Sequence, residues 1–196
     1  LAGANEAGMF SMAFVTGTLI MIASNYGVRN FQVSDIDEET SFSSYQLNRW
    51  ICGAIALALG LVYNSIRGYD PAMGTICLGV YLYKVIDGIA DVYEGRLQQK
   101  DKLYLAGISQ AFRSVVVLVV FSVALFITRN VGVSCIAMAV AACPSFVVLT
   151  LPLAIWETPK SKRATTQSVI ALFKQCAPLF VALFLYSLID NMPKFV

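Results

Sequence analysis

The chain has 196 residues, of which 58% are hydrophobic and only 13% are charged. Its mean hydropathy of +0.69 is too high for an ordinary soluble domain of this length, so the composition indicates an integral membrane protein. The formal net charge of +2 gives no support to nucleic-acid binding, and no nucleic-acid partner is expected.

Six segments are apolar and long enough to cross a hydrocarbon core of about 30 Å. They lie near residues 9–25, 50–66, 72–93, 104–128, 131–156 and 168–190. The first, second and fifth contain no charged residue, whereas the third, fourth and sixth each contain at least one. The sequence therefore predicts an all-α, polytopic transmembrane bundle over residues 1–196, with no soluble domain.

Lysine and arginine are distributed unevenly between the two ends of these spans. One end carries Arg29, Arg49, Arg96, Lys100, Lys102, Lys160, Lys162 and Arg163, and the other carries Arg67, Arg129 and Lys194. Cytoplasmic loops of membrane proteins carry the excess of positive residues. The loops near 26–49, 94–103 and 157–167 are therefore predicted to be cytoplasmic, in a multi-pass protein of the cytoplasmic (inner) membrane.

The third span carries four charges on one side. At about 100° per residue, Lys84, Asp87, Asp91 and Glu94 fall within an arc of roughly 80°. A charged side chain near the bilayer centre costs at least about 2.5–3.5 kcal/mol, so these side chains are expected to face protein or a water-filled cavity. Charges on three spans form the candidate substrate and ion pathway: Lys84, Asp87, Asp91, Arg113 and Lys174.

A structural alternative stays open, in which mutual ion pairing locks the spans together and serves no transport. The i to i+3 spacing of Lys84 and Asp87 permits such a pair. Asp91 and Glu94 approach the expected membrane surface, where plain hydration is the simpler expectation. Arg49, at the start of the second span, is expected to snorkel to the interface.

The residue content gives little support to catalysis. The chain has no histidine, which removes the commonest metal ligand and the usual proton shuttle. No serine or cysteine stands beside an obvious base, so nucleophilic catalysis is unsupported. We expect no catalytic residue, no metal and no cofactor, and a protein that is not an enzyme.

Several short motifs follow one another along the chain in a recognisable order. They are Gly8-Met-Phe-Ser-Met-Ala, Tyr26-Gly-Val-Arg29, Val33-Ser-Asp35, Tyr45 with Arg49, the Lys84/Asp87/Asp91 helix leading into Leu97-Gln98, and Asn191-Met-Pro-Lys194. In this order the chain resembles the polysaccharide or O-antigen flippases, the oligosaccharide-lipid branch of the multidrug/oligosaccharidyl-lipid/polysaccharide exporter superfamily. The likeness covers essentially the whole chain.

The resemblance implies an internal fragment, the second to seventh helix of a two-lobed, alternating-access transporter. It further implies that a polyprenyl-diphosphate-linked oligosaccharide is moved across the cytoplasmic membrane for polysaccharide or lipopolysaccharide assembly, coupled to H+ or Na+. Lys84, Arg113 and Lys174 would meet the diphosphate or acidic sugars. The implied partners are the lipid-linked substrate, membrane lipid, and a polysaccharide polymerase and ligase.

Two other functional classes remain open. A multidrug or cation antiporter of the same superfamily would need mainly acidic residues in its cavity, and the basic residues on the spans argue against it. A membrane-embedded glycan polymerase or glycosyltransferase would need long loops with catalytic residues, and the longest expected loop holds only a small acidic cluster at Asp35–Glu39.

Overall fold

The computed structural model describes residues 3–160 and 163–191, and these residues form helices and no strand. Six helical units among them are long and apolar enough to cross a membrane, which confirms the all-α, six-span class. The units are α1 (Ala4–Asn25), α3 (Phe42–Arg67), α4 (Pro71–Gln99), α5 (Leu103–Thr128), the continuous run α6 (Val131–Ser145), η1 (Phe146–Thr150) and α7 (Leu151–Glu157), and α8 (Thr166–Asn191).

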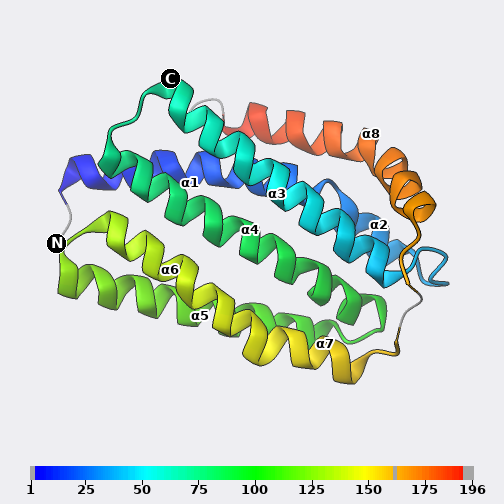
Figure 1. The fold of residues 1–196 in the computed structure, drawn as a ribbon. Helices are drawn as coiled ribbons and strands as arrows, with labels where there is room; N and C mark the ends of the chain where they lie inside the picture. The colour runs from blue at the N-terminus through cyan, green and yellow to red at the C-terminus, as the bar shows by residue number, and fades with distance from the viewer. Residues whose placement is uncertain (1–2, 161–162, 192–196) are drawn as a thin grey trace.

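Helix α4 is the centre of the bundle. In Figure 1 it runs through the middle, with α1 and α3 on one side and α5 and α6 on the other. Its start is well defined, because Asp70 accepts a hydrogen bond from the Met73 amide at 3.1 Å and Pro71 occupies the first turn. Every other membrane helix except α8 packs closely against it. Charges on α4 are therefore surrounded by protein from several directions.

Small residues allow the helices to approach α4 closely. A side-chain carbon added at Gly79 would lie 2.6 Å from the backbone of Cys135 on α6. One added at Gly17 on α1 would lie 2.7 Å from Val80 on α4. Close contact between small residues is a common mode of packing for membrane helices, and here it holds α1 and α6 against α4.

The region expected as a long loop over 26–49 is largely helical. It contains the short helix α2 (Val28–Ser34) and the first turns of α3. Gly27 makes the turn between α1 and α2 with φ of 68°, a conformation that favours glycine. Helix α2 then buries Val28 and Gln32, and the Gln32 amide donates to the Val92 carbonyl on α4 at 3.0 Å. This tertiary contact stabilises a helix too short to show as a periodic pattern.

The third span is longer than expected and continues to Gln99, through most of the expected loop 94–103. Its last turns are held by the loop after α2, since Arg96 pairs with Glu38 at 3.0 Å and Lys100 pairs with the same carboxylate. The Gln99 amide donates to the Asp35 carbonyl. The polar residues after position 93, which in the sequence indicate a loop, instead form the ion pairs and hydrogen bonds that hold the end of α4. We call this end of the bundle, with α2, the start of α3 and the end of α4, the α2 end.

The fifth span contains two prolines. Pro144 lies inside α6 and Pro152 lies in the first turn of α7. Between them, η1 is a π-helical segment in which the hydrogen bonds span one extra residue. The irregularity falls beside α4 and α5, where Thr150 is fully buried.

Candidate functional site

The first group of buried charges joins α4 to α5. Arg113 on α5 is 2% exposed and donates from Nε and Nη2 to Asp87 Oδ1, at 2.9 and 2.8 Å. Its Nη1 donates to Glu94 Oε1 at 2.6 Å. Asp87 and Glu94 are seven residues apart, two turns of α4, so both carboxylates reach one guanidinium. We call these three residues the Arg113 cluster; it carries one positive and two negative groups.

Hydroxyl groups complete this cluster. Thr150 on η1 accepts from Arg113 at 3.4 Å and hydrogen-bonds with Ser109, whose hydroxyl also reaches Glu94 at 3.5 Å. Glu94 is only 1% exposed. The expectation that Glu94 is hydrated is therefore wrong, because α5 and η1 cover this turn of α4.

The second group joins α4 to α2 and α3 and has the opposite composition. Asp91 accepts from Arg49 Nη2 at 2.8 Å through one oxygen and pairs with Arg29 through the other. Arg49 also donates to Asn25 Oδ1 at 2.7 Å, and Arg29 donates to Gln98 Oε1 at 2.8 Å. We call Asp91, Arg29 and Arg49 the Asp91 cluster; it carries two positive groups and one negative.

Arg49 shows a second expectation to be wrong. Its side chain is fully buried, whereas the sequence suggested an arginine that snorkels to the membrane surface. The reason is Asp91 on the neighbouring helix, which compensates the charge inside the bundle. A signal was present in the sequence, since Arg49 shares a helical face with the small residues Gly53, Ala56 and Gly60, all of them buried.

Lys84 lies apart from both clusters. It is half-buried, and its ammonium is 4.3 Å from the ring centroid of Phe14 on α1 and 5.6 Å from that of Tyr83. Such contacts with aromatic faces stabilise a cation without neutralising it. Among the described residues it forms no ion pair with Asp87, although their spacing permits one.

Lys174 lies away from the other four residues of the predicted pathway. It is exposed on α8, and the described part of the chain gives it no ion pair. Of the five predicted pathway residues, the structure places Asp87 with Arg113 in one cluster and Asp91 in the other. Arg29, Arg49 and Glu94 are the additional members that the sequence did not assign to this group.

A polar cavity of about 560 Å³ opens beside the Asp91 cluster. Its walls come from α1, α2, α4, α5 and α8. The polar side chains that line it are Asn25, Arg29, Asn30, Asp91, Gln110, Tyr186, Ser187 and Asp190. A cavity of this size is within the range of small-ligand sites, about 300–1,000 Å³. Arg29 and Asp91 therefore face a space that can hold a ligand, whereas Arg113 is enclosed by its partners.

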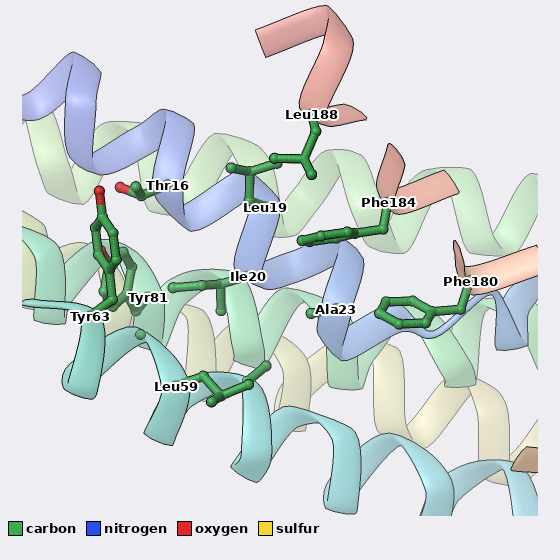
Figure 2. A pocket seen from close by; sticks show the side chains of 12 residues that line it. Thr16, Leu19, Ile20, Ala23, Leu59, Tyr63, Tyr81, Phe180, Phe184 and Leu188 are labelled. Atoms are coloured by element: carbon green, nitrogen blue, oxygen red, sulfur yellow. The ribbon is translucent and has the colours of Figure 1, made fainter. Parts of the chain in front are cut away.

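An apolar groove of about 440 Å³ lies between α1, α3 and α8. Figure 2 shows that leucine and phenylalanine side chains from all three helices point into it, with the hydroxyl groups of Thr16, Tyr63 and Tyr81 gathered at one end. The apolar side chains that line it include Leu19, Ala23, Leu59, Phe180, Phe184 and Leu188.

In the described ranges, no three His, Cys, Asp or Glu side chains lie close enough together to hold a metal ion. No protein-family model, no curated protein and no solved structure matches the chain. The membrane-spanning architecture, the two charge clusters and the two cavities are therefore the observations on which a function is argued.

Proposed function

We propose that the chain is part of a flippase that translocates a polyprenyl-diphosphate-linked oligosaccharide across the cytoplasmic membrane. The observation that carries this proposal is the polar cavity beside the Asp91 cluster. A diphosphate cannot cross apolar lipid without compensating charge. The cluster has one positive charge in excess, inside a bundle whose helices are long enough to span a membrane.

Arg29 is the residue best placed to meet the anionic group. It is about a quarter exposed and lines the polar cavity, whereas Arg49 behind it has no exposed surface. An arginine fork matches phosphate oxygens in geometry as well as charge. Lys84 is a second positive group, and unlike Arg29 it forms no ion pair among the described residues. Arg113 contributes to the pathway only when Asp87 or Glu94 releases it.

The proposal includes a location and partners. The α2 end carries most of the basic residues and is placed in the cytoplasm by the positive-inside rule, in the inner membrane. A gradient of H+ or Na+ would drive the cycle, and a polysaccharide polymerase and ligase would consume the product. The chain acts as a transporter in this scheme, and no residue is assigned a catalytic role.

The test is made in cells that carry the whole protein, with Arg29 replaced by Ala. Hydrogen bonds to charged groups contribute about 1.5–3 kcal/mol, so delivery of lipid-linked glycan to the outer leaflet should fall by about tenfold or more at unchanged membrane abundance. Arg67→Ala is the matched control, because Arg67 is exposed at the far end of α3. Delivery that falls only in proportion to abundance would contradict the proposal.

One observation favours a multidrug or cation antiporter as the second candidate. Asp190 is an exposed carboxylate on the wall of the polar cavity, and the described residues provide no ion-pair partner for it. A cationic substrate would pair with Asp190 and avoid Arg29. Asp190→Asn should then abolish transport of a lipophilic cation such as ethidium, while a flippase would keep glycan delivery in this variant.

A further inference from the structure

The polar cavity and the apolar groove lie against the same two helices. On α8, Leu183 and Ser187 line the polar cavity, and the next residue in each case, Phe184 and Leu188, lines the groove. Helix α1 contributes neighbouring residues to both cavities in the same way. Because consecutive helical residues point about 100° apart, α1 and α8 each present one face to the polar cavity and another to the groove, so the two cavities share these two helices as walls.

The groove offers a hydrocarbon surface and few free polar groups. The Thr16 hydroxyl donates to the Met12 carbonyl at 2.7 Å, and the Tyr81 hydroxyl donates to Asn64 Oδ1 at 3.0 Å. Leucine, isoleucine, alanine and phenylalanine make up most of the remaining wall. A polar ligand would lose its hydrogen bonds to water here without replacement, so the groove fits a hydrocarbon chain.

We propose that this groove holds part of the polyprenyl chain of a lipid whose diphosphate occupies the polar cavity. The inference rests on the proposed function, which does not say where the hydrocarbon chain of the lipid binds, and it assigns that surface to the groove. The groove's volume of about 440 Å³ is within the range of small-ligand sites, about 300–1,000 Å³. A ligand with one anionic end and one apolar end matches two cavities of these two kinds that share the walls α1 and α8.

The neighbouring charge selects this lipid over an ordinary membrane lipid. The Asp91 cluster, with its excess positive charge, borders the polar cavity, and Arg29 faces it; the carboxylate of Asp190 on the α8 wall of the same cavity opposes part of this attraction. A diphosphate carries more negative charge than the phosphodiester of a phospholipid, and its electrostatic gain at this cluster is correspondingly larger.

The test fills the groove without touching the polar cavity. Leu59 lines the groove and is 60% exposed, so Leu59→Trp adds bulk there with little effect on the core. Leu61→Trp is the matched control, two residues along the same helix, 41% exposed and outside the groove. The whole protein is placed in phosphatidylcholine nanodiscs, and binding of a long-chain polyprenyl diphosphate and of inorganic pyrophosphate is measured separately.

Leu59→Trp should weaken binding of polyprenyl diphosphate by about tenfold, the loss that corresponds to two buried methylene groups, and leave pyrophosphate binding unchanged. Leu61→Trp should change neither. Equal affinities in the two tryptophan variants, equal loss of both probes, or displacement of the polyprenyl probe by excess phosphatidylglycerol would overturn the inference.

Arg29→Ala separates this inference from the proposed function. If it leaves pyrophosphate binding intact, the proposed head-group site is wrong. A selective effect of Leu59→Trp on the polyprenyl probe would still support the groove.

Discussion

The two charge clusters on α4 have the same number of charged groups and opposite compositions. The Arg113 cluster places one arginine between two carboxylates, and the Asp91 cluster places one carboxylate between two arginines. Together the two clusters are electrically neutral, with three positive and three negative groups. The difference between them is access: the first is closed by α5 and η1, whereas the second borders the polar cavity.

This arrangement indicates that the net charge of a buried cluster and its exposure to a cavity are independent of each other. The closed cluster joins two helices, and its arginine has no surface left for a ligand. The open cluster leaves one arginine, Arg29, partly exposed behind a fully buried one. Structural and ligand-binding roles can thus be assigned to neighbouring turns of one helix, and substitutions at the two clusters should separate them.

The largest effect is expected for Arg113→Leu. It leaves Asp87 and Glu94 facing each other inside the bundle without a cation, and breaking a buried pair in this way costs about 3–5 kcal/mol. Unfolding of the protein in detergent, followed by circular dichroism, should show this loss. Arg113→Lys keeps the charge and should recover part of it. A stability close to that of the unchanged protein would mean that the cluster is not a structural lock.

Glu94→Gln should have a much smaller effect. Arg113 keeps Asp87 as its partner, and the amide oxygen of glutamine still accepts a hydrogen bond, so the free energy of unfolding should fall by only about 1 kcal/mol. The same unfolding measurement applies. A loss as large as that of Arg113→Leu would show that Glu94, and not Asp87, compensates the arginine.

The smallest effect is expected outside both clusters, for Lys102→Ala. Lys102 pairs with Glu157 at 2.6 Å, but both side chains are partly exposed, and exposed pairs contribute about 0–1 kcal/mol. The change in unfolding free energy should be within that range and should shrink further in high salt. A loss above it would place this pair with the buried clusters.

The fold class could be predicted from the sequence because length and apolar content alone define membrane spans. Helix α2 could not, since seven residues with one Arg and several polar side chains give no periodic apolar pattern. Its stability comes from contacts with α4, including the buried Gln32. The sequence of a short segment does not show a contact with a residue about 60 positions away, such as that between Gln32 and Val92.

The sequence places four charged residues, Lys84, Asp87, Asp91 and Glu94, on one side of α4. It does not show which neighbouring helices these side chains contact. Within that arc, Asp87 and Glu94 turn to α5, Asp91 turns to α2 and α3, and Lys84 lies against Phe14 on α1. Periodicity gives the direction of a side chain around its own helix axis. Which neighbouring helix stands in that direction depends on packing, through close approaches such as that of Gly79 to α6.

The π-helical segment η1 decides which side chain meets the Arg113 cluster. A π turn contains one residue more than an α-helical turn, so every later residue is displaced by one place, or about 100° around the axis. In an uninterrupted α-helix, Leu149 would point where Thr150 now points. The extra residue thus exchanges an aliphatic side chain for a hydroxyl at the guanidinium of Arg113.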